Sequence, residues 1–562
     1  MNRKNLTAAV LAGLAGAAGI VGSAQAVNIN PDGLGQVLIY PYYTTNGGNT
    51  TLISVVNTTG DAKAVKVRFM EGENTREVLD FNLYLSAYDV WTAGIVDVAG
   101  TPTLITNDTS CTVPYIYGNG GTQAFLPYAM IDKDPKVADD ISRATEGHFE
   151  MIEMGTIIDQ ISEILDDSGE GDPVSFDPPQ FGPTYGSAVA ATHDATGMPA
   201  DCEQLVRAWT QTDSLDPATK GYWLKDSFTD LEAPSGGLFG GAAIINVSTG
   251  TLYSYDAKAI NGFASSVDAD DDLHQEPGRV LPSLNSGDDH NGIVFLDNGT
   301  ILQSGWLDRT VDAVSFVFMH DNILNEYTTE AAIAGSTEWV ITFPTKHFYV
   351  YEPSSGDAPP IAPFTSIWDW TPAVPDDPDT DKDESEDAFT TYPCEVVALN
   401  TIWDREEQTL IPPDAPVGTP VPPIVSPAPP PVSGPDPDGI IPFELCFETN
   451  VITFGAEVST GQTSILGSRN TTNIDNEALG FEFGWARINM VDATSDTDGS
   501  GTIEPDEILI RQPLGGLYGL PVTGFAVVRY QNGFLGDGAD VLANYGGIFQ
   551  HKATRTMSSG SN

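Results

Sequence analysis

The chain has 562 residues and a formal net charge of −54, from 78 acidic and 24 basic residues. A surface this acidic excludes nucleic acid and anionic membranes as partners, because like charges repel, and it favours divalent cations. Hydrophobic residues make up 41% of the chain, and 56 glycines and 40 prolines indicate short strands joined by many turns.

The N-terminus has the pattern of a secretory signal peptide. Arg3 and Lys4 precede an apolar run over residues 6–21, and Ala24 and Ala26 supply the small residues of a cleavage site. We expect residues 1–26 to be removed, which leaves 22 basic and 78 acidic residues and a net charge of −56. No later stretch has 18 consecutive apolar residues, so we expect no transmembrane span. The predicted location is secreted or at the cell surface, with the periplasm as the alternative.

Four short segments near the N-terminus alternate apolar and polar residues with period two, or are rich in β-branched and aromatic residues: 36–44, 51–57, 65–69 and 79–85. This pattern is typical of strands with one buried and one wet face. We therefore predict a mainly β fold, an antiparallel β-sandwich of immunoglobulin-like kind with short helices in long loops.

The same region carries the motifs Gly35-Gln-Val-Leu-Ile-Tyr-Pro-Tyr-Tyr43, Val55-Val-Asn57, Val65-Lys-Val-Arg-Phe69 and Val78-Leu-Asp-Phe-Asn82. With these motifs, residues 30–93 resemble the start of uncharacterised exported bacterial cell-surface proteins. The resemblance implies export and brings no activity with it.

We divide the rest of the chain by composition. After the signal peptide (1–26) and the first strands (27–100) come a β-rich region with helical insertions (101–352), an acidic and proline-rich linker (353–443) and a C-terminal β region (444–562). In these regions we expect helices at 138–147, 156–167 and 200–209, a hairpin at 241–255, and strands at 311–319, 338–343, 346–351, 447–454, 481–491 and 522–530. Twelve prolines fall within residues 412–437, which cannot pair in the centre of a sheet.

The four cysteines are Cys111, Cys202, Cys394 and Cys446. An even count in an exported chain predicts two disulfides, with three connectivities open. We expect nearest neighbours to pair, Cys111 with Cys202 and Cys394 with Cys446, because each bridge then stays within one region. A cysteine metal site is not expected, because no two cysteines are close in sequence.

One stretch has residue types and spacing that specify a cation site. Oxygen ligands recur at alternate positions, a glycine follows where the chain must turn, and an acidic residue closes the set: Asp496, Asp498, Ser500, Thr502 through its carbonyl, Glu504 through a water, and Glu507 as the bidentate ligand. This pattern resembles the EF-hand calcium loop and implies Ca²⁺ as the ion. Both flanks read as extended rather than helical, which departs from the EF-hand, so we do not expect sensor behaviour.

A second acidic cluster, Asp268 and Asp270–Asp272 with His274 and Glu276, is a weaker candidate for a second cation site. Trp368, Trp370 and Trp403 offer rings for stacking on sugars, but packing of these loops against the core is the simpler interpretation.

The sequence carries no nucleophile-elbow, zinc-protease or phosphate-loop motif, and its seven histidines are far apart. We therefore expect a non-catalytic, calcium-binding, exported protein with a structural or adhesive role, whose partners are calcium and other surface proteins, copies of itself or glycans. The alternative is an extracellular glycan-active enzyme or a carbohydrate-binding protein on a β-sandwich scaffold, since a catalytic carboxylate pair has no sequence signature.

Overall fold

The computed structural model describes residues 26–130, 141–159, 185–216, 219–266, 273–350, 362–366, 369–370, 390–391, 393–409, 441–455, 464–477, 479–494, 508–534 and 542–558. Strands dominate these residues and most sheets are antiparallel, as the sequence predicts, with a few short helices between them. The immunoglobulin-like kind of sandwich stays a prediction. Among the helices of these ranges, none is long and apolar enough to cross a membrane.

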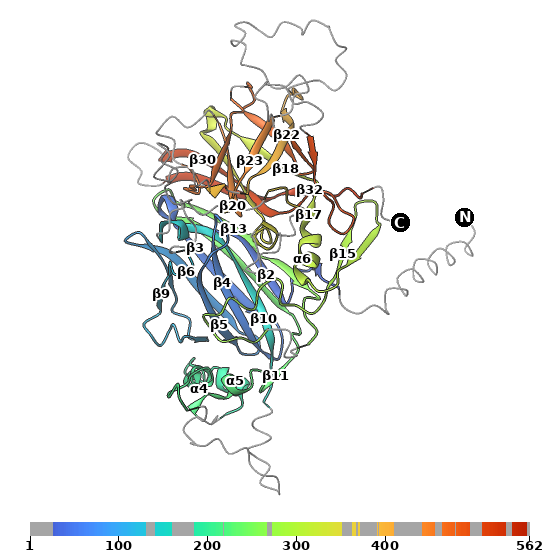
Figure 1. Cartoon of the computed structure of the whole chain (residues 1–562). Coiled ribbons are helices and arrows are strands. Elements are labelled where there is room, and N and C mark those ends of the chain that lie inside the picture. Colours follow the sequence, from blue (N-terminus) through green and yellow to red (C-terminus); the bar gives the residue numbers. More distant parts are fainter. Residues whose placement is uncertain are drawn as a thin grey trace, which may run out of the picture.

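Two sheets face each other in the lower, blue half of Figure 1 and form the first sandwich. One is an eight-stranded sheet with the order β1 (Asn28–Ile29), β14 (Lys258–Asn261), β2 (Val37–Thr44), β10 (Glu146–Ile157), β4 (Ala62–Glu71), β5 (Glu77–Leu85) and β8 (Cys111–Val113), with β11 (Leu231–Glu232) also paired to β10. The other is a six-stranded sheet with the order β13 (Thr251–Asp256), β12 (Leu238–Asn246), β3 (Asn49–Asn57), β6 (Val90–Val98), β7 (Thr101–Ile105) and β9 (Thr122–Ala124). Their facing side chains, such as Phe69, Trp91 and Ile244, make the main apolar core.

A second sandwich lies above the first, in orange and red (Figure 1). One five-stranded sheet has the order β23 (Ile441–Leu445), β22 (Glu395–Asp404), β26 (Phe483–Asn489), β18 (Asn322–Thr328) and β32 (Lys552–Thr554). The other has the order β25 (Thr471–Ile474), β24 (Thr449–Phe454), β19 (Gly335–Thr342), β30 (Thr523–Phe534) and β31 (Leu542–Gln550). Trp339, Ile452 and Ile488 belong to the core between these sheets.

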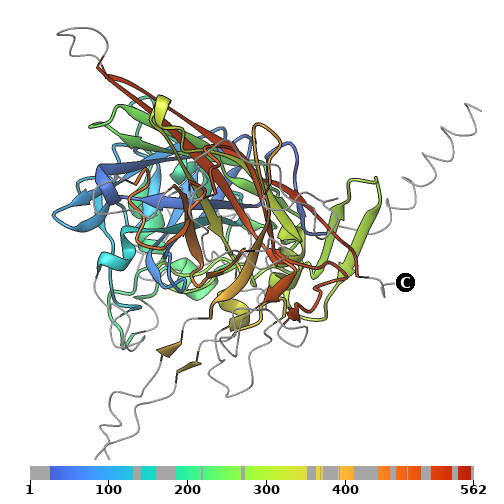
Figure 2. The same ribbon diagram turned by 90° about the horizontal axis from the view of Figure 1, so that it is seen from above.

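The two sandwiches share a packed seam. Val340, Val451 and Phe525 of the second sandwich belong to the same apolar cluster as the core of the first, and Phe525 stacks on Tyr255 with ring centroids 4.8 Å apart. Figure 2 looks down on the second sandwich, whose long red strands run across the molecule. Because this seam is apolar, burial stabilises the contact between the sandwiches by the hydrophobic effect.

Short helices and hairpins cover the outer face of the eight-stranded sheet. Near one end lie α6 (Thr310–Phe318), α7 (His347–Val350), the hairpin of β15 (Asn291–Phe295) with β16 (Ile301–Gly305), and the antiparallel pair of β17 (Met319–His320) with β29 (Leu520–Pro521). At the other end, α3 (Ser187–Ala191), α4 (Cys202–Ala208) and α5 (Tyr222–Lys225) form a helical cap.

The helical cap is held by a chain of buried polar groups. Trp209 Nε1 donates to Tyr84 Oη at 2.7 Å, and Tyr84 Oη lies 3.3 Å from His274 Nε2. His274 Nδ1 lies 2.6 Å from Ser227 O, so this nitrogen is the donor. Because each buried group finds a partner, the aromatic cluster of the cap has one favoured arrangement.

Two predicted strands are helical in the structure. The 311–319 segment is helix α6, not a strand, because all nine of its residues are buried and an apolar run without periodicity does not distinguish the two. Residues 346–351, predicted as a strand, contain the helical turn α7. The described part of the expected helix at 138–147 is a short 3-10 helix, Ile141–Thr145, followed by the start of strand β10. Of the expected helix at 156–167, the first two residues end β10, and residues 160–167 lie outside the described part. The predicted helix at 200–209 is confirmed as α4.

His551, between β31 and β32, is half-buried and held neutral by its two partners. Its Nε2 lies 3.0 Å from Val340 O and must donate, whereas its Nδ1 lies 3.0 Å from the amide nitrogen of Asn325 and must accept. Burial lowers the pKa of His551 to about 4, and the charge of Lys258 acts in the same direction. Protonation of Nδ1 would place two donors against each other.

This arrangement predicts acid lability. The folded pKa is lowered from 6.5 to about 4, so between these values the unfolded chain binds more protons. Stability from this group is complete above pH 6.5 and is lost as the pH falls toward 4, by at most about 1.4 kcal/mol per pH unit. We expect urea unfolding between pH 4.5 and 7.5 to show a shallower pH dependence in His551→Gln than in the wild type. The half-buried His290→Gln is the control, and equal slopes in His551→Gln and wild type would contradict the prediction.

Candidate binding groove

The outer face of the six-stranded sheet carries an open groove of ≈ 1000 Å³. The strand register explains it, because residues on six neighbouring strands fall into one row: Ser254, Ala243, Leu52, Gly94, Ile105 and Thr122. A second row places Asp256, Gly241, Ser54 and Thr92 side by side. Most of these side chains are small, so the two rows form a trough that crosses the strands.

Apolar ridges flank the trough. On one side Phe239, Val56 and Val90 are in register, and the side chains of Phe239 and Val90 are 42% and 44% exposed. On the other side Leu252, 54% exposed, pairs with Ile245. Exposed apolar side chains gathered on one face of a very acidic protein indicate a contact surface for another molecule.

The lining of the groove is nearly uncharged. Its described residues include no lysine, arginine or histidine, and its two carboxylates are Asp108 and Asp256. Asp108 accepts hydrogen bonds from the backbone N of Thr92 at 3.0 Å and from the hydroxyl of Ser110 at 2.7 Å. The arrangement can therefore hold a ligand through hydroxyl groups, one amide and apolar contact rather than through charge.

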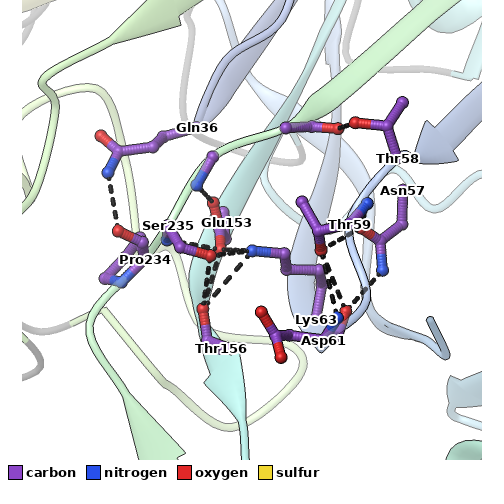
Figure 3. Close-up of polar contacts among 12 residues, drawn as sticks. Gln36, Asn57, Thr58, Thr59, Asp61, Lys63, Glu153, Thr156, Pro234 and Ser235 are labelled. Carbon is purple, nitrogen blue, oxygen red and sulfur yellow. Dashed lines mark hydrogen bonds and ion pairs between the residues drawn. The ribbon is translucent and has the colours of Figure 1, made fainter. Parts of the chain in front are cut away.

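Figure 3 shows the polar network that fixes the start of β12, the strand that carries Gly241 and Ala243. Lys63 and Glu153 form an ion pair of 2.8 Å, and both side chains are fully buried. Glu153 also accepts from the backbone N of Ser235 at 2.9 Å and of Gly236 at 2.7 Å. Gly236 takes a φ of +76°, which favours glycine, and this turn aims its N–H at the carboxylate.

Two further strands hold the same segment. Gln36, just before β2, donates to Pro234 O at 2.9 Å, and Thr58, just after β3, donates to Gly237 O at 2.7 Å (Figure 3). Residues 234–237 are therefore fixed to both sheets of the first sandwich. This anchoring places β12 next to β3 in the register that creates the trough.

The same network contains a serine beside a lysine, a pairing that serves as a nucleophile and base in some hydrolases. Ser235 Oγ contacts Lys63 Nζ, which also lies 3.4 Å from the hydroxyl of Thr156. A general base needs a free lone pair to accept the proton of the nucleophile. Lys63 Nζ is instead ion-paired with Glu153 and donates to its carboxylate. The backbone N–H groups of Ser235 and Gly236 are likewise taken by Glu153 and cannot stabilise an oxyanion. These contacts give Lys63 a structural role.

Sequence reasoning missed this groove, although the hairpin at 241–255 and the strand at 51–57 are confirmed as β12–β13 and β3. The trough depends on pairing Ala243 with Leu52, about 190 positions apart, and on the register between them. The available signal was the small outward-facing residues at alternate positions, Gly241 and Ala243, on a strand otherwise flanked by large apolar ones.

Both predicted disulfides are present. Cys111 of β8 is bonded to Cys202 of α4, and Cys394 is bonded to Cys446 beside the β22–β23 pair. The described residues contain no free cysteine. A carboxylate, Glu444, lies near the second disulfide, but bonded cysteines offer no thiolate to a metal.

The calcium-loop residues Asp496, Asp498, Ser500, Thr502, Glu504 and Glu507 lie outside the described residues. The segments on either side are described and are strands, β27 (Asp492–Thr494) and β28 (Ile508–Ile510), paired antiparallel with Thr494 opposite Ile508. The extended flanks predicted for this loop are therefore confirmed. The acidic run, the proline-rich segment 412–437 and residues 1–25 also lie outside the described part.

In the second acidic cluster, the structure removes His274 from the predicted cation ligands. His274 is buried in the helical cap, where both ring nitrogens have protein partners, and burial lowers its pKa to about 4. Glu276 lies beside Arg279 at 3.5 Å, and Asp268 and Asp270–Asp272 lie outside the described residues.

Trp403 stacks on Trp485, with ring centroids 6.4 Å apart, in the second sandwich.

Comparison with known proteins does not add to this description. A scan of family models, a search of curated proteins and a search of solved structures each find no match to the chain.

Proposed function

We propose that this chain is an exported, non-catalytic, calcium-binding protein of the cell surface or extracellular space, with an adhesive role, and that its binding surface is the groove on the six-stranded sheet. The groove is the single observation that carries the proposal. It is open, it crosses six strands, and it is flanked by exposed apolar ridges on a protein with a net charge of −54. Such a surface suits a long ligand bound along its length rather than a small molecule enclosed in a pocket.

The adhesive role is tested by filling the trough. Ala243 is half-buried and faces outward, so Ala243→Trp should place an indole across the groove without disturbing the core. We expect beads that carry the mature protein to be retained on films of extracellular matrix, and Ala243→Trp to reduce retention at least tenfold. Val247→Trp, at an 84% exposed position in the turn after the same strand, is the matched control. Equal retention of wild type and Ala243→Trp would overturn the proposal.

Support for calcium comes from the ligand pattern and from the hairpin that closes the loop. The pairing of β27 with β28 brings the two ends of residues 495–507 together, as a compact loop around an ion requires. The four carboxylates of the set, those of Asp496, Asp498, Glu504 and Glu507, repel one another until a cation neutralises them. A hairpin without two flanking helices would fix the ion as a structural element.

Calcium should therefore raise the melting temperature. For an extracellular site with a Kd of roughly 10⁻⁴–10⁻³ M, about 10 mM Ca²⁺ adds on the order of 1.4–2.7 kcal/mol by mass action. Mg²⁺ should do less, because it demands a tighter octahedron. Glu507→Gln should abolish most of the Ca²⁺ effect, since it removes the charged bidentate ligand. The measurement is the melting shift with Ca²⁺ in both proteins; equal shifts would mean general screening of the acidic surface.

A further inference from the structure

We propose that the ligand of the groove is an uncharged glycan chain laid across the strands of the six-stranded sheet; this inference rests on the proposed function and names its ligand. The first row of the trough crosses six strands, and the second crosses four of them. Adjacent strands are about 4.8 Å apart, so five intervals give a length of about 24 Å. That length holds several units of an extended polymer.

The charges in the groove exclude polyanions and offer little to polycations. Without a basic residue in its described lining, the groove has no partner for sulfate, phosphate or uronate groups. Both oxygens of Asp108 already accept hydrogen bonds from neighbours. Asp256 lies close to Lys258. Burial lowers the pKa of Lys258, and the negative charge of Asp256 opposes part of that shift. Asp108 is already hydrogen-bonded and Asp256 already lies beside a lysine, so neither carboxylate calls for a cationic ligand. An uncharged ligand therefore fits the groove best.

The backbone of the groove argues against a peptide. Extended peptides gain affinity by adding a strand to a sheet edge, where main-chain groups are unpaired. The trough runs over β12, β3 and β6, each of which is paired on both sides. Thr92, in the trough, also has its backbone N bonded to Asp108. A peptide backbone laid here would leave its own amides without partners, which is costly.

A glycan brings the complementary groups. The trough presents the hydroxyls of Ser54, Ser254 and Thr122. The Ser54 hydroxyl donates to Gly241 O at 3.4 Å and can accept from a ligand, and the hydroxyls of Ser254 and Thr122 can both donate and accept, as sugar hydroxyls do. The ridges present Phe239 and Leu252, whose exposed apolar surface can pack on the C–H faces of sugar rings. The first row has a hydroxyl at each end and apolar or small residues between them, so a sugar chain laid along it meets both hydroxyl and apolar groups.

The test uses the full mature protein with defined polymers in affinity electrophoresis and biolayer interferometry. The uncharged probes are soluble α-glucan, β-glucan and mannan; alginate and hyaluronan are the anionic probes and oligolysine is the cationic one. We expect at least one uncharged glycan to bind, with an affinity that changes less than twofold between low and high salt, since no charge pairing is involved. Ala243→Trp and Ser254→Trp, both outward-facing, should weaken that binding at least tenfold, and Val247→Trp should not.

The outcomes separate the two proposals. If only alginate, hyaluronan or oligolysine binds and Ala243→Trp removes that binding, the groove is the binding surface and the glycan assignment is overturned. If no probe binds but Ala243→Trp still abolishes retention on matrix films, the glycan assignment is again overturned while the adhesive groove stands. If an uncharged glycan binds equally well to wild type, Ala243→Trp and Ser254→Trp, with melting temperatures unchanged, the ligand site lies elsewhere and the inference fails.

Discussion

Replacement of Glu153 by alanine is expected to lower the free energy of unfolding by about 3–5 kcal/mol, because it leaves a buried cation without its partner. Lys63 and Glu153 are both fully buried, and the carboxylate also accepts two backbone N–H groups from the segment that begins β12. Glu153→Ala therefore removes the partner of Lys63 and orphans the N–H groups of Ser235 and Gly236 at once. Urea unfolding at pH 7.5 measures the loss.

Lys63→Met is the informative control. The carboxylate of Glu153 keeps its two backbone donors in this variant, so we expect a smaller loss of stability than in Glu153→Ala. If Ala243 and Leu52 owe their register to this network, Glu153→Ala should also accelerate hydrogen exchange in β12 more than in the distant strand β22. A Lys63→Met variant less stable than Glu153→Ala would show that the lysine, and not the carboxylate, holds the segment.

Loss of the Cys111–Cys202 disulfide is expected to have the second large effect. The bridge closes a separation of 91 residues, for which the chain-entropy treatment gives about 4–5 kcal/mol. It ties β8, at the edge of the eight-stranded sheet, to α4 of the helical cap. In the Cys111→Ala/Cys202→Ala double variant we expect lower stability in urea and faster proteolysis of the cap.

The Cys394→Ala/Cys446→Ala double variant is the matched comparison. That bridge spans 52 residues and should contribute about 4 kcal/mol on the same treatment. Because it joins β22 and β23 of the second sandwich, its loss should leave the cap as resistant to protease as in wild type. If both double variants expose the cap equally, the cap is held by global stability and not by its own disulfide.

Local patterns in the sequence were enough for the strands that alternate cleanly. Val65, Val67 and Phe69 lie in the main core, and the 241–255 segment is a hairpin, as period-two alternation predicts. The wet face expected for β4 is wrong, because Lys66 and Arg68 are also buried, in ion pairs. The pattern failed where polar and apolar residues do not alternate along a buried element. β10 is buried along all twelve residues and contains Glu146, Glu150 and Glu153, so it lacks the polar face that identifies a strand. The strand prediction for the segment that forms helix α6 was wrong for the same reason.

The sequence by itself determined the β class and the extended flanks of the predicted calcium loop, because each depends on neighbours in sequence. It left three disulfide connectivities open, and the structure has the expected nearest-neighbour pairs. Only the tertiary structure decided the groove and the network behind it. Their residues, such as Leu52, Ala243 and Gly94, come from separate strands whose register no local pattern reports. The free-energy cost of burying the charge of Lys63 is likewise offset by its ion pair with Glu153, 90 positions away. Non-local pairing sets both features, since a shift of one residue in β12 would turn the groove residues of that strand, Gly241 and Ala243, to the other face of the sheet.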